Sequence, residues 1–318
     1  MSGSSSAFRA AIFSNLGAAP DVIEPGRLQR FATRDRRGDD AGFCKMFDDQ
    51  RGGVYGCNRQ YPGQVFTWFG LDRNRMTPTE RAALHRHVEQ GRRDREVAQR
   101  SQWATNAGRI AALWDQCVPT EPSDAVSLYL TDRLRCDVSP VPECLRLHPA
   151  LPYMAEGETV DTWPAMVARL TAPGGGLLAL HRTWLTADGN KAATPGPCKK
   201  LTPTAGHLTG ACIRLGRPEA GQIGIAEGIE TSLAARYASG VPTVAAYSSG
   251  ALAGWQWPSG LRRLVIFADA DAAGAEAADK LRRRARLAGL SVEVMTPTMP
   301  GADWCDVWAG RGTEGAAA

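Results

Sequence analysis

Closely paired cysteines are missing from this 318-residue sequence. Eight cysteines are present, but none forms a CxxC pair, whereas structural zinc usually draws on two such pairs. We therefore expect no zinc ribbon and no bound zinc, although Cys44 and Cys57 could supply half of a site. The scattered cysteines are typical of free thiols in a reducing cytoplasm, which is the location we expect.

Long apolar segments are missing as well. No apolar run reaches the length of a membrane span, so we expect no membrane partner. Met1–Ala7 has no basic start followed by an apolar stretch, so we expect no secretory signal. The sequence also lacks an internal repeat and a P-loop, since residues 189–192 have neither the spaced glycine nor the Ser/Thr of that motif.

The composition is that of an ordinary soluble protein, with 43% hydrophobic and 22% charged residues, and the length allows two modest domains. A net charge of +4 and a pI of about 8.7 permit nucleic-acid binding without requiring it. The arginines cluster in three places, any of which can equally be a solvated face. These clusters are Arg34, Arg36 and Arg37; Arg92, Arg93 and Arg95; and Arg282, Arg283, Arg284 and Arg286.

The N-terminal part of the chain divides into a tail and a small β-rich unit. Residues 1–26 are rich in Ser and Ala and predict a flexible tail that is loose or weakly helical. Residues 27–75 alternate Gly, aromatic and polar residues, which is typical of short antiparallel strands with Gly turns. Tyr55, Phe66 and Trp68 either stack on single-stranded nucleic acid or form a small core, and we favour the core.

A polar helical connector follows at residues 76–118. Thr77 is a good N-cap, Pro78 suits the first helical position, and Glu80 completes a capping box. Dense charge on most sides predicts one or two exposed helices between domains. Residues 119–220 are rich in proline turns and apolar segments, and we expect an α+β subdomain there.

Residues 221–310 alternate short apolar runs with helical segments. Strands that alternate with helices predict a parallel sheet with helices on both faces, so the fold class is α/β. Residues 311–318 are small and predict a tail.

Two acidic clusters mark this C-terminal region. Glu227 and Glu230 follow one apolar run, and Asp269 and Asp271 follow another. Carboxylates at the carboxyl ends of neighbouring parallel strands meet at one edge of the sheet, where they repel one another unless a cation joins them. Mg²⁺ or Mn²⁺ is the natural occupant, because both prefer oxygen ligands. Alternatively, Glu230 is a helix N-terminal acid, and the two aspartates cap a helix.

The sequence Glu227-Gly228 followed by Asp269-x-Asp271 resembles the Toprim domain, which DnaG-type primases, topoisomerases and some nucleases share. The resemblance implies a Rossmann-like domain in which Glu227, Asp269 and Asp271 hold divalent metal and carry the catalysis. Primases of this type often have an acid four residues after the Glu, but here that residue is Thr231 and Glu230 precedes it.

The resemblance continues on both sides of these acids. Asp303 and Asp306 resemble the acidic segment that ends primase Toprim domains, so they either reach the metal or cap a terminal helix. From about residue 27 to residue 310 the chain is similar to phage- and plasmid-encoded primase-like proteins. Such proteins place basic residues before the Toprim domain to bind template and nucleotide. The nearest candidates here are Arg182, Lys191, Lys199 and Lys200.

The leading hypothesis is a DNA primase that makes short RNA on a single-stranded DNA template from nucleoside triphosphates. Metal at Asp269 and Asp271 would bind the triphosphate, and Glu227 would orient a metal or help deprotonate the attacking hydroxyl. We expect a separate helicase, or DNA already single-stranded, to provide the template. A metal-dependent nuclease and a non-catalytic accessory protein that binds single-stranded nucleic acid are the alternatives. A topoisomerase is disfavoured, because no tyrosine domain of adequate size accompanies the acids.

Overall fold

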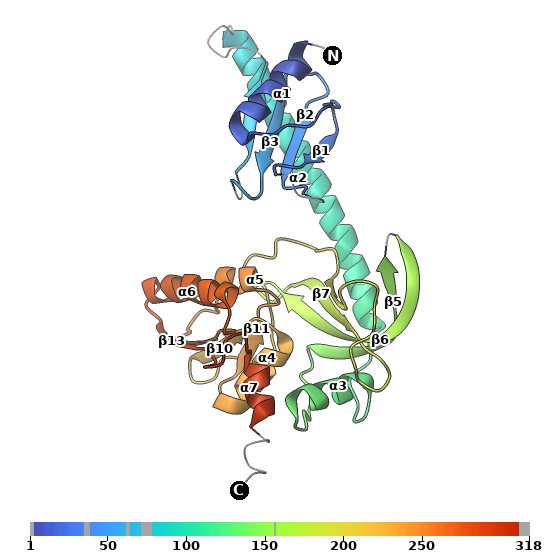
Figure 1. The fold of residues 1–318 in the computed structure, drawn as a ribbon, viewed down its shortest axis with the longest axis vertical. Helices are drawn as coiled ribbons and strands as arrows, with labels where there is room; N and C mark the ends of the chain where they lie inside the picture. Colours follow the sequence, from blue (N-terminus) through green and yellow to red (C-terminus); the bar gives the residue numbers. More distant parts are fainter. Residues whose placement is uncertain (1–2, 35–38, 62–63, 71–77, 156, 312–318) are drawn as a thin grey trace. The chain divides into compact units, whose positions relative to one another are not determined.

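The fold is described from a computed structural model, which describes residues 3–34, 39–61, 64–70, 78–155 and 157–311 (Figure 1). The chain divides into two compact units, an N-terminal unit of residues 1–96 and a C-terminal unit of residues 97–318. Arg36, Arg37, Thr77 and residues 312–318 of the predicted tail lie outside the described residues.

Up to residue 70, the described part of the N-terminal unit forms a helix and a four-stranded antiparallel sheet in the order β1-β2-β3-β4. Its elements are α1 (Gly3–Leu16), β1 (Leu28–Phe31), β2 (Gly42–Met46), β3 (Gly52–Cys57) and β4 (Phe66–Phe69). In β2, buried residues alternate with half-buried ones, as a strand with one face on a core requires. The predicted antiparallel β unit is therefore present.

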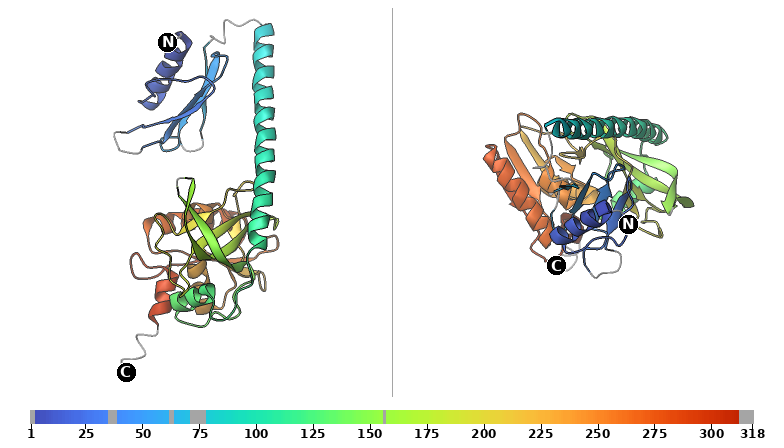
Figure 2. Two further views of the ribbon diagram at one scale, coloured as in Figure 1. Left: turned by 90° about the vertical axis from the view of Figure 1, so that its right-hand side faces the viewer. Right: turned by 90° about the horizontal axis from the view of Figure 1, so that it is seen from above.

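The prediction of a flexible tail at residues 1–26 was wrong for α1. This helix packs against the sheet (Figure 2). The side chains of Phe8 and Ile12 are fully buried. A Cβ at Gly53 of β3 would lie 2.5 Å from the Phe8 ring, so glycine permits the close approach. The Ser- and Ala-rich composition concealed a helix in which Phe8, Ile12 and Leu16 are buried in the core of this unit, whereas Phe13 is exposed.

The three aromatic residues of this sheet belong to its core. Tyr55 is buried, and Phe66 and Trp68 pack against the same buried cluster. Tyr55 and Phe66 stack with ring centroids 5.5 Å apart, and Phe8 lies 5.1 Å from Trp68. The favoured interpretation of these aromatics as a small core is confirmed.

The predicted connector is one helix, α2 (Pro78–Asp115), which would extend about 57 Å at 1.5 Å per residue. Residues 92–100 are all exposed, as the dense charge predicted. Further on, Ile110 and Trp114 are buried in a core of the C-terminal unit. The last turns of this helix therefore belong to the C-terminal unit.

The C-terminal unit is built on one continuous mixed sheet in the order β13-β12-β10-β11-β9-β6-β7-β8, with β5 paired to β6. Helix α3 (Ala125–Leu134) precedes the antiparallel part of the sheet. The antiparallel strands are β5 (Leu145–Ala155), β6 (Glu158–Thr171), β7 (Leu177–Trp184), β8 (Lys199–Leu201) and β9 (Cys212–Ile213). Its parallel part consists of β10 (Gln222–Ala226), α4 (Ile229–Ser239), β11 (Thr243–Ala245), α5 (Ser249–Gly254), β12 (Arg263–Phe267), α6 (Ala272–Leu287), β13 (Ser291–Met295) and α7 (Trp304–Gly310).

The parallel sheet has helices on both faces, which confirms the predicted α/β class. On one face α3, α4 and α7 pack together, and on the other α5 packs against α6 (Figure 1). In the sheet, the two parts meet where β11 pairs antiparallel with β9, at Ala245 and Ile213. Residues 119–220 therefore share a sheet and a core with the residues that follow. Among the described helices, none combines the length and apolar character of a membrane span.

Candidate functional site

The two acidic clusters meet at one edge of the parallel sheet. Strands β10 and β12 are neighbours, and the last residue of β10, Ala226, pairs with the last residue of β12, Phe267. Glu227 directly follows the first strand, and Asp269 lies two residues beyond the second. This register brings the acids together at the carboxyl edge, where open α/β sheets bind ligands.

Asp269 is the most perturbed carboxylate of this edge. Its Oδ1 atom is buried and has no hydrogen-bond partner among the described residues. Burial, together with the charges of Asp303, Glu227, Asp271 and Asp306, raises the pKa of Asp269 to about 7. A buried carboxylate surrounded by like charges is unfavourable unless a proton or a cation neutralises it.

Asp271 has a second role as the N-cap of α6. Its Oδ1 accepts a hydrogen bond of 2.6 Å from the backbone N–H of Gly274. A Cβ at Gly274 would lie 2.6 Å from the backbone oxygen of Asp269, so only glycine fits beside the acidic turn. The capping alternative weighed for the aspartate pair is thus observed for Asp271, which also acts electrostatically on Asp269.

Glu227 is half-buried between β10 and the start of α5. Burial and the charge of Asp271 raise the pKa of Glu227, while a hydrogen bond from the Ser249 backbone acts in the opposite direction. The main chain here is fixed by a 2.8 Å hydrogen bond from Tyr247 N–H to the Glu227 carbonyl. A carboxylate with a raised pKa at a sheet edge is suited to accept a proton.

Asp303 adds a fourth carboxylate to this edge and caps α7. Its side chain accepts the backbone N–H of Asp306, and Asp306 in turn accepts the N–H of Asp303, which completes a capping box. The Thr231 hydroxyl donates to Asp303 Oδ2 over 3.4 Å. The capping alternative for Asp303 is therefore observed, and its charge also acts on Asp269, whereas a contact with metal stays a prediction.

Glu230 is directed away from this group, in contrast to its prediction as a metal ligand. Both its carboxylate oxygens lie within 3.0 Å of Lys199 Nζ, and the Tyr129 hydroxyl donates to Oε1. Although burial acts to raise it, Lys199 and Tyr129 hold the pKa of Glu230 at about 2. The charge of Glu230 is therefore already compensated without a metal ion.

Three of the four predicted phosphate-binding residues have partners within the fold. Arg182 donates to the Leu201 carbonyl, Lys199 pairs with Glu230, and Lys200 donates to the Met154 carbonyl. The side chain of Lys191 is exposed. Tyr129, which the sequence analysis missed, lies 101 positions from Glu230, and no spacing signal in the sequence links residues so distant.

The acids provide a suitable donor set for a hard cation, because all of them offer carboxylate oxygens. The partnerless buried oxygen of Asp269 is the observation that favours an ion there. Within the described ranges, however, no three His, Cys, Asp or Glu side chains converge as metal ligands do. Binding an ion would require these side chains to turn toward a common point.

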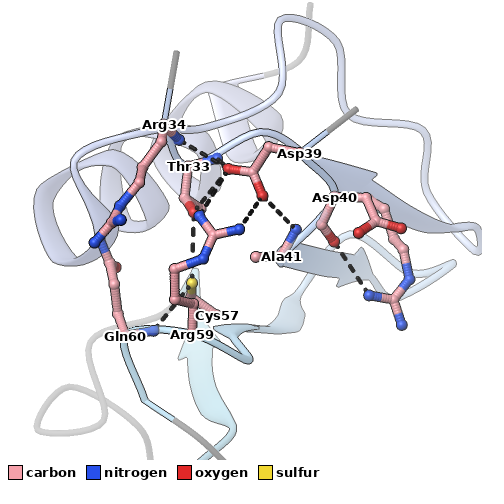
Figure 3. A network of polar contacts seen from close by, with 9 residues as sticks. Thr33, Arg34, Asp39, Asp40, Ala41, Cys57, Arg59 and Gln60 are labelled. Carbon is pink, nitrogen blue, oxygen red and sulfur yellow. Dashed lines mark hydrogen bonds and ion pairs between the residues drawn. The ribbon is translucent and has the colours of Figure 1, made fainter. Parts of the chain in front are cut away.

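The N-terminal unit contains a separate polar network around Asp39 (Figure 3). Hydrogen bonding to Arg59 is the main cause that holds the pKa of Asp39 well below its usual range. The backbone N–H groups of Thr33, Arg34 and Ala41 donate to the same carboxylate. These bonds join Thr33, Arg34, Ala41 and Arg59 through one carboxylate, so we assign Asp39 a structural role.

Cys57 lies beside this network, and its sulfur is hydrogen-bonded by the Gln60 backbone and the Thr33 hydroxyl (Figure 3). Cys44 and Cys57 are on the adjacent strands β2 and β3, and both are buried. All eight thiols are free.

Two family models match the C-terminal unit, one over the antiparallel part of its sheet and one over the parallel part. Residues 104–215 match a family model described as a domain of unknown function, DUF7146. Residues 222–314 match a family model described as the Toprim domain. The comparison with curated proteins found no match.

Several solved structures are similar to the chain, all with low sequence identity. One is a DNA primase domain from Pseudomonas aeruginosa, with 16% identity, a TM-score of 0.35, and coverage of 53% of this chain and 55% of that one. The RNA polymerase domain of Mycobacterium tuberculosis primase DnaG has 16% identity, a TM-score of 0.39, and coverage of 69% and 81%. The Aquifex aeolicus primase, with zinc-binding and RNA polymerase domains, has 13% identity, a TM-score of 0.40, and coverage of 99% and 84%.

The chain thus spans about half of the length of the Pseudomonas protein. The expected closeness to phage and plasmid proteins stays a prediction. The residues that match the family model include the parallel strands β10 and β12 and the acids at their carboxyl ends. Residues 222–314 of this chain are therefore a Toprim domain.

Proposed function

We propose that this chain is a primase-like nucleotidyltransferase that makes short RNA on single-stranded DNA. The observation that supports this best is the environment of Asp269 in the Toprim domain. Its partnerless buried oxygen lies among other carboxylates, so the site favours a divalent cation. Cations at such sites serve reactions of phosphate esters, in which negative charge must be neutralised.

Glu227, Asp269 and Asp271 would hold Mg²⁺ or Mn²⁺, and Asp303 is placed to assist. The ion would supply positive charge at the triphosphate. A 3′-hydroxyl would attack the α-phosphate, and the new P–O bond would form as the bond to the leaving pyrophosphate breaks. If Glu227 does not ligate the ion, it would instead accept the proton of that hydroxyl, because its raised pKa brings it closer to neutral pH. Thr231 would steady Asp303 through their hydrogen bond.

The basic residues divide into two groups under this proposal. Lys191 is exposed and would contact phosphate directly. Arg182, Lys199 and Lys200 would help to position the β7–β8 pair through the bonds they already make, and any contact with nucleotide would use their remaining N–H groups. The substrates would be nucleoside triphosphates, with a separate helicase or single-stranded DNA supplying the template.

The test is a priming assay with labelled ribonucleotides, single-stranded DNA and Mg²⁺ or Mn²⁺. We expect short RNA from the wild type, and none from Asp269→Asn or Glu227→Gln. Asp161→Asn, which changes an exposed acid of β6, is the matched control and should prime normally. Calorimetric titration with Mn²⁺ gives a second measurement that does not depend on activity, and binding should weaken only in the two site variants.

The same proteins distinguish a primase from a nuclease and from a non-catalytic binding protein. DNA or RNA cut by wild type with Mn²⁺ in the absence of nucleotides would indicate a nuclease instead. Salt-sensitive DNA binding that survives Glu227→Gln, without any product from the wild type, would indicate a non-catalytic binding protein. Equal priming by wild type and Asp269→Asn would contradict the assigned role of the acids.

A further inference from the structure

Four arginines line one groove of the C-terminal unit, away from the acidic edge. The groove has a volume of about 980 Å³ and lies between the end of α2, β5, β6 and the segment after β9. Its charged lining residues are Arg146, Arg169, Arg214, Arg217 and the single carboxylate Glu143. This volume is at the upper end of the roughly 300–1,000 Å³ found for small-molecule sites.

The four guanidinium groups have no acidic partner. Among the described residues, no ion pair joins any of them to a carboxylate. Nε of Arg169 is buried and lacks a hydrogen-bond partner in the same part of the chain. Uncompensated positive charge in a groove attracts an anion, because concave surfaces concentrate the electrostatic potential.

The fold holds three of these side chains in place. The guanidinium groups of Arg146 and Arg169 lie 4.5 and 5.5 Å from the centre of the Trp114 ring. Arg214 donates to the carbonyls of Ala172 and Pro173, both over 2.7 Å. Side chains fixed in this way lose little conformational entropy when they bind phosphate. Since Trp114 is already covered by arginines, it is not a free stacking surface.

An apolar hollow adjoins the basic groove. It shares Arg214, Gly216, Arg217 and Pro218 with the groove, and its other lining residues include Pro173, Trp255 and Pro258. A strand of nucleic acid has charged phosphates next to flat apolar bases. The arginines could therefore contact its phosphates, and the apolar hollow beside them could contact a base.

The groove lies at the opposite edge of the parallel sheet from the acids. Arg217 precedes the start of β10, whereas Glu227 follows its end, and this strand of five residues spans roughly 16 Å. Gly216 lies beside the first residue of β11, Thr243. A ligand in the groove would therefore be separate from one at the acidic edge.

We infer that this groove binds the phosphate backbone of single-stranded nucleic acid as a second site, distinct from the acidic edge. Only the choice of nucleic acid as the ligand rests on the proposed function. A strand held there would stay bound to the protein while its other end occupies the acidic edge. The four arginines are the contacts that would position it.

The experiment measures binding of the full chain to a fluorescein-labelled (dT)12 oligonucleotide by anisotropy, in EDTA and without divalent metal. Arg217→Glu is the main variant, because this exposed side chain makes no described hydrogen bond or ion pair. We expect the Kd to rise roughly three- to tenfold and the slope of log Kd against log salt to fall by about 1. The conservative variant Arg217→Lys should retain most of the binding.

Arg100→Glu, an equal charge change at an exposed site of α2, is the control and should bind as the wild type does. Circular dichroism verifies that each variant is folded. A Kd and a salt slope of Arg217→Glu equal to those of Arg100→Glu would overturn the inference. It would also be overturned if Arg217→Glu weakened ATP binding but left (dT)12 binding unchanged, since the groove would then take free nucleotides.

Failure of this inference is distinguishable from failure of the proposed function. Asp269→Asn should bind (dT)12 normally in EDTA, because its site is on the other edge. If the wild type primes and Arg217→Glu binds (dT)12 normally, the inference about the groove is wrong and the proposed function stands. If Arg217→Glu loses (dT)12 binding and the wild type does not prime, the proposed primase activity is wrong and the inference about the groove stands.

Discussion

The ammonium group of Lys199 lies 2.8 and 3.0 Å from the two carboxylate oxygens of Glu230. This ion pair joins β8, on the antiparallel side of the sheet, to the first turn of α4 in the Toprim domain. Tyr129 of α3 completes the contact by donating to the same carboxylate. The Toprim domain thus contacts the region before it through this ion pair and hydrogen bond, in addition to their shared apolar core.

Lys199→Ala should destabilise the C-terminal unit, because it leaves Glu230 buried without its cation. Removing one partner of a wholly buried pair costs about 3–5 kcal/mol, and we expect about 2 kcal/mol since the Lys199 side chain is 37% exposed. Urea unfolding measures the difference. Lys280→Ala, at an exposed pair with Glu276, should leave stability almost unchanged. Equal effects of the two substitutions would contradict this role of Lys199.

The stabilisation from Glu230 should depend on pH. Its pKa falls from an ordinary 4.5 to about 2 on folding, so its contribution is present above pH 4.5 and is lost as pH falls toward 2. Glu230→Gln should therefore be less stable than the wild type at pH 7, and the gap should narrow below pH 4.5. Urea midpoints across this pH range provide the measurement. A gap that is independent of pH would show that the charge of Glu230 does not matter.

Asp269→Asn should make the metal-free protein more stable. Because folding raises the pKa of Asp269 from 3.8 to about 7, the cost of its charge is absent below pH 3.8 and complete above pH 7. We expect a gain of about 1–2 kcal/mol at pH 8 in EDTA, reduced from the full shift because the group is partly exposed. Thermal unfolding at pH 8 and pH 4 checks this, and excess Mn²⁺ should stabilise only the wild type. A less stable Asp269→Asn at pH 8 would refute the repulsion described at the acidic edge.

Phe8→Ala should detach α1 from the N-terminal sheet. Phe8 is fully buried against Gly53 and Trp68, and truncating a buried Phe costs about 3–5 kcal/mol. Phe13 of the same helix is 60% exposed, so Phe13→Ala is the matched control and should cost little. Hydrogen exchange of the backbone amides of α1 and β3 reports the loss. Similar protection in the two variants would restore the interpretation of this segment as a tail.

Much of the C-terminal fold could be predicted from local pattern. Apolar runs that alternate with helical segments specify a parallel sheet, and a carboxylate at the end of a run must emerge at its edge, so Glu227 and Asp269 were identified without coordinates. The N-terminal helix was missed, because its apolar residues are sparse and acquire meaning only against the sheet they cover.

The order of residues along the chain determined which strands end in acids and which face of each strand is apolar, since both follow from periods of two and 3.6 residues. Only the tertiary structure decided which charges become neighbours. It turned Glu230 toward Lys199 and Tyr129, it set Asp303 beside Asp269, and it collected four arginines from separate segments into one groove. Contacts between residues far apart in sequence depend on how the sheet is assembled, and no local spacing encodes that.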